Sequence, residues 1–135
     1  MQLGDSLKVA ASGMKAQSDR LRVIAENIAN AEAAGRTPGE LPYRRKMVVF
    51  KNVLDKELGI ETVKVVARVP DKSDYIRKFE PYHPAADDQG YVMYPNVNTI
   101  IESVDMKEAR RSYEANLAVI EVSKSMMTRT LDLLR

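Results

Sequence analysis

Both ends of this 135-residue chain carry apolar residues that recur every seven positions. Toward the N-terminus one row consists of Leu7, Met14, Leu21 and Ile28, and a companion row consists of Leu3, Ala10, Gln17, Ile24 and Ala31. Toward the C-terminus the row is Met106, Tyr113, Ile120, Met127 and Leu134. A helix with such a stripe needs a partner helix along its length. The sequence between the stripes is too short to cover both, which predicts helices that pair with each other and then with other subunits.

The first helix is expected to begin at Asp5 or Ser6, because either side chain can cap the first turn. It is expected to continue to Ala34, with Gly35 as the left-handed residue that follows a helix. The next residues, up to Pro42, contain two glycines and two prolines, which predicts a loop.

The last helix is expected to begin at Thr99, since Thr99 and Glu102 have the spacing of a capping box. No helix breaker follows, so it should continue to the C-terminus. The terminal helical domain is therefore predicted to contain residues 1–34 and 99–135, and residues 35–98 are predicted to form an insertion.

The insertion contains short strand-like patterns. Residues 43–50 alternate as a strand does, residues 60–69 place Val63, Val65, Ala67 and Val69 on one face, and residues 91–94 form a further short strand. Residues 87–90 predict a turn, and residues 52–59 are ambiguous, with a short helical turn as the interpretation offered. The fold class is therefore α+β, with two long antiparallel terminal helices that resemble a coiled coil and a small β-rich insertion.

The composition excludes several classes of protein. The net charge of +2 gives no electrostatic reason to expect a nucleic-acid or membrane-surface partner. The absence of cysteine excludes disulfides and thiolate metal sites. No apolar run approaches the roughly 20 residues that cross a bilayer, and the first residues do not fit a cleavable signal peptide. By these rules alone the protein would be expected to stay in the cytoplasm.

No pattern in the sequence predicts catalysis. His83 is the single histidine, and its spacing from Glu80, Asp87 and Asp88 fits no zinc or calcium template. No nucleophile elbow or phosphate-binding glycine loop is present. We therefore expect no enzyme activity, no cofactor, no metal and no small-molecule substrate. The basic run 44–46 is interpreted as a solvated or edge-protecting strand face.

Four amides lie in or beside the helical stripes, namely Gln17, Asn27, Asn30 and Asn116. A buried amide between helices costs stability but can fix their register. The period alone does not separate a buried position from the margin of a stripe, so both interpretations stand. The predicted subunit-interface set is Leu7, Met14, Gln17, Leu21, Ile24, Asn27, Ile28, Asn30, Met106, Tyr113, Asn116, Leu117, Ile120, Met127, Leu131 and Leu134.

Ordered motifs along the chain resemble a known family. The N-terminal series Ser12-Gly13-Met14, Ala16-Gln17, Arg20-Leu21 and Glu26-Asn27-Ile28-Ala29-Asn30-Ala31 resembles that of the bacterial flagellar rod and hook proteins, the axial family. Later motifs are similar to its proximal-rod branch, namely Pro42 to Lys46, Val48 to Phe50, Tyr82 to Asp87, Gly90 to Val92, Pro95 to Asn98, Val104 to Met106, Arg111 to Asn116 and Lys124 to Met127. The resemblance leaves out the stretch from Leu54 to Arg77. The chain departs from the family at Ala31-Glu32-Ala33. In many axial proteins a threonine follows the Ala-Asn-Ala turn at this place.

The resemblance implies a structural subunit of the flagellar basal body, without catalytic activity. It implies export through the flagellar type III apparatus, which uses no cleaved signal, and a final place in the periplasmic rod. The implied neighbours are other rod subunits, the MS-ring-to-rod adaptor FliE and the MS ring. The terminal helices would pack around an axial channel and transmit torque.

Two other functions remain as alternatives to this resemblance. A cytoplasmic coiled-coil adaptor would form a stable soluble helical dimer at low concentration. A small hydrolase using His83 and Asp87 would lose activity when His83 is replaced by alanine.

Overall fold

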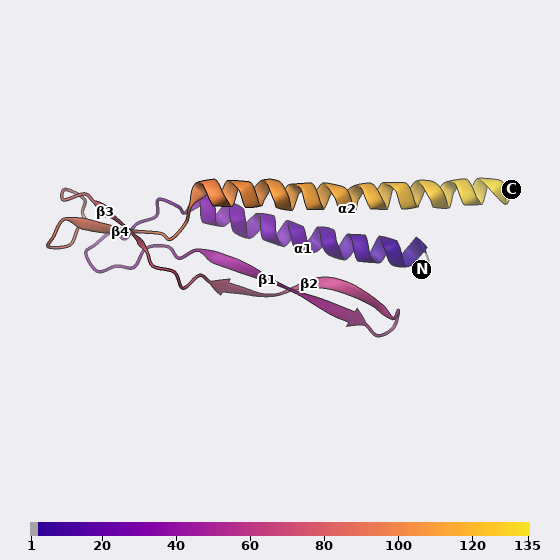
Figure 1. Cartoon of the computed structure of the whole chain (residues 1–135), viewed down its shortest axis with the longest axis horizontal. Coiled ribbons are helices and arrows are strands. Elements are labelled where there is room, and N and C mark those ends of the chain that lie inside the picture. The colour runs from indigo at the N-terminus through magenta and orange to yellow at the C-terminus, as the bar shows by residue number, and fades with distance from the viewer. Residues whose placement is uncertain (1–2) are drawn as a thin grey trace. The chain divides into compact units, whose positions relative to one another are not determined.

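The computed structural model describes residues 3–135, in which there are two helices and two two-stranded sheets (Figure 1). The elements in order are α1 (Leu3–Ala29), β1 (Lys46–Asp55), β2 (Ile60–Pro70), β3 (Ile76–Phe79), β4 (Tyr91–Tyr94) and α2 (Thr99–Leu133). Strand β1 pairs with β2, and β3 pairs with β4. The predicted α+β class is confirmed. Neither helix has a segment apolar enough to cross a lipid bilayer.

The chain divides into two compact units. We call the first the helical unit; it consists of Met1–Leu21, Val48–Ala67 and Lys107–Arg135. We call the second the junction unit; it consists of Arg22–Met47 and Arg68–Met106. Both helices and the β1–β2 hairpin contribute residues to each unit.

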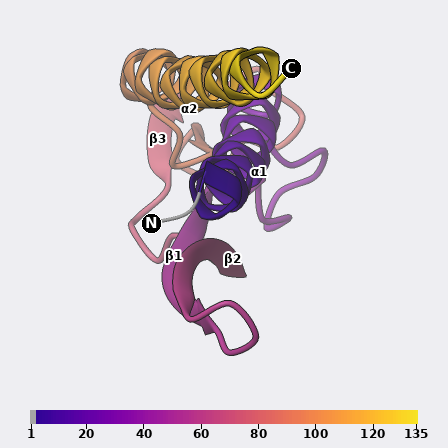
Figure 2. The ribbon, with the colours of Figure 1, turned by 90° about the vertical axis from the view of Figure 1, so that its right-hand side faces the viewer.

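In the helical unit, α1 lies between the hairpin and α2 (Figures 1 and 2). On one side the Ser12 hydroxyl accepts a hydrogen bond from the Val63 backbone N–H at 3.3 Å. On the other side Gly13 lies against the side chain of Asn116, and Arg20 pairs with Glu108 at 3.7 Å. Gly13 contacts Asn116, and the later residue Arg20 contacts the earlier residue Glu108, which confirms that the two helices are antiparallel.

The junction unit contains most of the large buried side chains. Val92 and Tyr94 on β4 are buried, as is Val97 beyond the strand, and α1 adds Val23 and Ile24. Among the described residues of the helical unit, the buried ones are all small, namely Ala10, Ala16, Ala109 and Ser123. The helical unit therefore buries little apolar side-chain area within one chain.

The end of α1 differs from the prediction. The helix stops at Ala29. The backbone N–H and the side-chain amide of Asn30 still donate to the Glu26 carbonyl, but the backbone N–H groups of Ala31 and Ala33 donate to carbonyls only three residues back, as in turns. The chain then continues in tight turns. The backbone at Gly35 is not left-handed; a side chain there would instead collide with the Glu40 carbonyl. The proposed N-terminal cap is also wrong, since α1 already includes Asp5 and Ser6.

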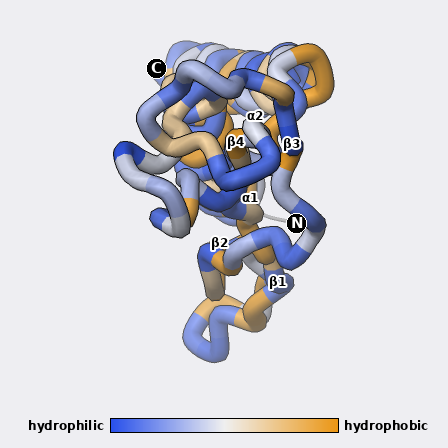
Figure 3. Tube along the Cα trace, turned by 90° about the vertical axis from the view of Figure 1, so that its left-hand side faces the viewer, coloured by the Kyte–Doolittle hydropathy of each residue, from blue (hydrophilic) through white to orange (hydrophobic). Residues whose placement is uncertain are grey.

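The strand boundaries agree only in part with the sequence patterns. The predicted strand at 60–69 is confirmed as β2, with Val63, Val65, Ala67 and Val69 on its less exposed face. The apolar and polar residues of β1 and β2 can be followed in Figure 3. Strand β1 begins at Lys46 rather than at residue 43 and continues to Asp55. Strand β3 was missed, because its four residues are all exposed and show no alternation.

The start of α2 at Thr99 is confirmed, but its cap is Asn98 and the capping-box prediction is wrong. The Asn98 side-chain oxygen accepts from the backbone N–H groups of Ile100 and Ile101 at 3.1 and 3.4 Å. The Glu102 carboxylate is 1% exposed and binds other partners. A capping box needs that carboxylate at the helix terminus, so burial of Glu102 explains the difference.

The turn before β4 depends on Gly90. Its φ is +83°, and an added Cβ would lie 2.9 Å from the Phe79 ring and 3.1 Å from Pro81. Gly39 also has a positive φ, +86°, but open space around it. We expect Gly39→Ala to cost about 1–2 kcal/mol of stability through backbone strain alone, and Gly90→Ala to cost clearly more. Urea denaturation of both variants measures the difference; equal losses would contradict close packing at Gly90.

Candidate functional site

The predicted interface residues of α1 lie on its inner faces. Ile24 and Asn27 are buried, and the others are half-buried, namely Leu7, Met14, Gln17, Leu21, Ile28 and Asn30. The side-chain oxygen of Gln17 is buried and is the one such atom in the described residues without a hydrogen-bond partner. Leu21 and Ile28 stay partly accessible beside the intrachain contacts.

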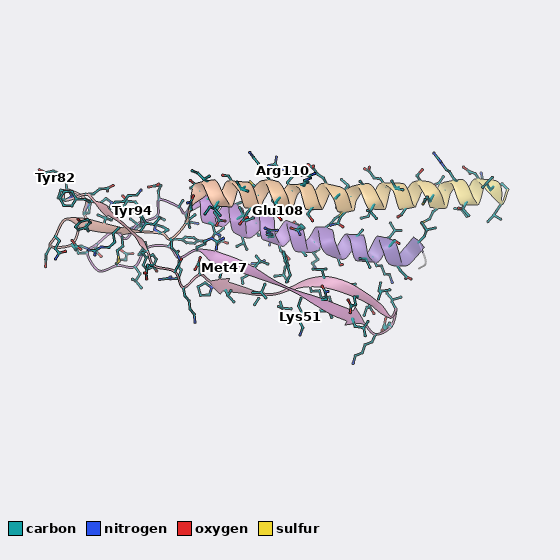
Figure 4. The ribbon with its side chains drawn as sticks, viewed as in Figure 1. Met47, Lys51, Tyr82, Tyr94, Glu108 and Arg110 are labelled. Atoms are coloured by element: carbon teal, nitrogen blue, oxygen red, sulfur yellow. The ribbon has the colours of Figure 1, made fainter. Side chains whose placement is uncertain are left out.

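The predicted interface residues of α2 are more exposed. Met106, Tyr113, Asn116 and Ile120 are half-buried, whereas Leu117, Met127, Leu131 and Leu134 are exposed. Leu134 lies just beyond the helix end. Further exposed apolar side chains on α2 are Val104, Val119, Val122, Met126 and Leu133. They share the helix with exposed charges such as Arg110 (Figure 4). Apolar area of this extent on one helix is typical of a surface that other chains cover.

A different row of α2 is the most buried one. Glu102, Ala109 and Ser123 are 1%, 0% and 7% exposed, and Asn116 completes their seven-residue spacing. These residues are small or polar. The apolar stripe found in the sequence flanks this row, which leaves part of the stripe accessible.

The junction unit contains a buried polar network centred on Asn27. The Asn27 amide donates to the Lys46 carbonyl at 2.9 Å and to Glu102 at 3.3 Å. Its oxygen accepts from the Lys46 backbone N–H at 3.0 Å and from the Tyr43 hydroxyl at 2.8 Å. Every hydrogen-bonding position of this amide is therefore used. Asn27 binds both backbone groups of the first residue of β1, as a neighbouring strand would.

Arg45 carries the charge at the centre of this network. Its guanidinium pairs with the buried carboxylate of Glu102 and, at 3.2 Å, with Asp71. Asp105 lies 4.0 Å away. Asn96 accepts a hydrogen bond from the Arg45 backbone N–H at 2.8 Å. The network joins the end of α1, the start of β1, the start of α2 and the segment after β2.

The basic run 44–46 was interpreted wrongly as a solvated strand face. Arg44 donates to the carbonyls of Asp71 and Ser73 and lies 4.2 Å from the centre of the Tyr75 ring. Arg45 is held as described above, and Lys46 pairs with Glu26 at 2.7 Å. Periodicity did not indicate this, because the partners come from segments that are distant in sequence.

Several pKa values in the network are shifted. Hydrogen bonds from Ser73 and Arg45 lower the pKa of the Asp71 carboxyl. Burial, together with the Glu26 carboxylate, raises the pKa of the Tyr43 hydroxyl. For Arg45, burial opposes the charge, but the bonds to Glu102 and Asp71 outweigh it and raise the pKa.

The shift at Asp71 predicts a pH dependence of stability. A carboxyl whose pKa is lower in the folded state stabilises above its ordinary pKa of 3.8 and loses this effect as the pH falls through the folded value. We expect Asp71→Asn to lose about 1 kcal/mol or less at pH 7, and to lose less further stability than the parent protein below pH 4. Denaturant midpoints between pH 3 and 7 measure this. The exposed neighbour Asp74, changed to asparagine, is the control; identical acid profiles for the parent and Asp71→Asn would contradict the assignment.

His83 and Asp87 shape a turn. The Nδ1 atom of His83 accepts from the Ala85 backbone N–H at 3.0 Å. The Asp87 carboxylate accepts from the backbone N–H groups of Gln89 and Tyr91, each at 2.9 Å, which lowers its pKa. This confirms the predicted turn at 87–90. Within residues 3–135, no group of three or more histidine, cysteine or acidic side chains is placed to hold a metal.

Arg45, Asp71, Asn96 and Glu102 were not identified in the sequence as members of one network. The available signal was Glu102, an acidic residue that shares the seven-residue spacing of Ala109 and Asn116. A charged residue in such a row suggests a buried partner, but the row does not reveal which cation supplies it.

Comparisons with known proteins agree along the chain. Residues 7–35 match the family described as flagella basal body rod protein, and residues 88–133 match the family described as flagellar basal body rod FlgEFG protein C-terminal. The chain is 49% identical to flagellar basal-body rod protein FlgC of Agrobacterium fabrum, over 98% of this chain and 96% of that protein. It is 42% identical to FlgC of Salmonella typhimurium, over 98% of each, and 40% identical to FlgC of Borreliella burgdorferi, over 100% of this chain and 99% of that one.

Proposed function

Because the chain belongs to the family of flagellar basal-body rod proteins FlgC, we propose that it enters the proximal rod by packing its terminal helices against neighbouring subunits. It is a structural subunit of the rod and not an enzyme. The observation that supports the assembly mode is the exposed apolar area of α2, including Val119, Val122 and Met126, whose side chains are about half exposed in the single chain. Covering such side chains in a neighbour's helices supplies the free energy of assembly.

The terminal helices would form a coiled-coil-like inner layer, and the insertion of residues 35–98 would lie outside it. In the junction unit the ends of α1 and β1 and the start of α2 are joined through Asn27, Arg45 and Glu102. A fully hydrogen-bonded buried network resists deformation. This makes the junction suited to pass torque between the helices and the insertion.

The neighbours that we propose are other rod subunits, the adaptor FliE and the MS ring. The route is export by the flagellar type III apparatus without a cleaved signal, to a periplasmic position. The competing idea of a cytoplasmic coiled-coil adaptor predicts a soluble dimer that never leaves the cell.

The test is deletion of the gene in its own bacterium, complemented with an epitope-tagged copy. Deletion should abolish swimming, and the tagged chain should restore it and label the rod of purified basal bodies under immunogold electron microscopy. Tagged protein found as a cytoplasmic dimer in swimming cells, with unlabelled basal bodies, would contradict the proposal.

A further inference from the structure

In the helical unit, Gly13 of α1 lies directly against the side chain of Asn116 of α2. An added Cβ at Gly13 would lie 2.9 Å from Nδ2, 3.2 Å from Cγ and 3.3 Å from Oδ1 of Asn116. The Asn116 side chain is held in place, since its Nδ2 donates to the Ser112 carbonyl at 3.1 Å. The asparagine therefore occupies the space that any other residue at position 13 would need.

The most buried side chains of this contact are small and do little to set the axial alignment of the two helices. Its buried residues on the two helices include Ala10, Ala109 and Ser123. Small side chains interlock weakly, so a shift along the axis is resisted less than by large apolar knobs. A single asparagine between two helices is known to select one register at some cost in stability.

Gly13 is the one position on this face of α1 that lacks a Cβ and so leaves room for the Asn116 side chain. Gly13 and Gly4 are the only glycines in α1. Moving α1 by one heptad would put Ser6 or Arg20 opposite Asn116, and each has a Cβ where the amide now lies. One heptad shift in either direction would thus produce the same collision.

We propose that Gly13 and Asn116 form a register lock, in which Asn116 is a positioning residue that holds α1 and α2 in a single axial alignment. This rests on the proposed function, because the alignment decides which apolar residues the helix pair presents to neighbouring subunits. The lock would therefore act on rod assembly, without contributing binding area of its own.

The experiment is a double-mutant cycle in the complemented deletion strain, with Gly13→Ala, Asn116→Ala and the two combined. The three atoms nearest to the new Cβ all lie beyond the Cβ of Asn116, so Asn116→Ala removes these close contacts. Gly13→Ala should reduce the yield of intact rods several-fold, although alanine is the better helix former. The combined variant should match Asn116→Ala alone. Gly4→Ala is the matched control, since no atom lies within 4 Å of a Cβ there, and it should swim normally.

Leu21→Asp, in the same strain, separates this proposal from the proposed function. If Leu21→Asp blocks rods while Gly13→Ala leaves them intact, or acts equally with and without Asn116, the register lock is wrong and the assembly mode stands. If neither variant affects rods, both proposals fail. The lock is supported if Gly13→Ala loses more rods than the combined variant and Asn116→Ala alone also loses rods. Normal rods with Asn116→Ala alone would show a close contact that does not set the alignment, and would contradict the lock.

Discussion

Replacing Glu102 by alanine should lower the free energy of unfolding by about 3–5 kcal/mol, the usual result of removing one partner of a buried ion pair. Glu102 is 1% exposed, and its removal leaves the guanidinium of Arg45, 20% exposed, without its buried partner. The Asn27 amide also loses an acceptor. Denaturation of the purified full-length chain, followed by circular dichroism, measures the loss.

The matched control is Glu108→Ala on the same helix. Its carboxylate is 69% exposed and 3.7 Å from Arg20, so the expected cost is less than about 1 kcal/mol. Equal small losses for the two variants would mean that the network around Arg45 does not stabilise the junction unit. Glu102→Gln should be intermediate, because the amide keeps an acceptor for Arg45 but loses the charge.

Leu21→Asp and Ile120→Asp should each prevent rod assembly. Leu21 and Ile120 are both half-buried in the single chain. In the proposed rod a neighbouring subunit would complete their burial. A carboxylate placed in such a contact costs on the order of several kcal/mol. Cells should be non-motile, while the protein is still secreted if it leaves by the proposed export route, which would take an unfolded chain.

Ser18→Asp adds the same charge at an exposed position of α1 and should leave swimming intact. Immunoblots of the medium and electron microscopy of basal bodies separate a failure of secretion from a failure of assembly. Normal rods in either Leu21→Asp or Ile120→Asp would show that these stripes are not covered in the rod.

The two helices could be predicted from the sequence because the residue patterns that indicate a helix are local. Seven-residue recurrence of Leu7, Met14 and Leu21 predicts a long amphipathic helix. The start of α2 at Thr99 was predicted from the Thr99–Glu102 spacing, although that capping box does not form. The boundaries were less accurate. Helix α1 ends at Ala29 rather than at Ala34, because i→i−3 turn bonds begin at Ala31, and Asn98 rather than Thr99 caps α2.

The motif Ser12-Gly13 illustrates what a sequence pattern leaves undecided. The sequence identifies it as part of a family resemblance, but not what the two residues do. In the structure Ser12 binds the hairpin through Val63, and Gly13 admits Asn116. Two adjacent residues of α1 thus contact different elements, because successive positions on a helix point in different directions.

By itself the sequence determined the α+β class, the two amphipathic terminal helices, strand β2 and the relation to flagellar rod proteins, since these depend on local periodicity and ordered motifs. Only the tertiary structure decided which row of α2 is buried, and that Arg45, Asp71, Asn96 and Glu102 meet around Asn27. The physical reason is that a buried charge is tolerated where its partner lies in space. That partner can be distant in sequence, where no period or spacing records it.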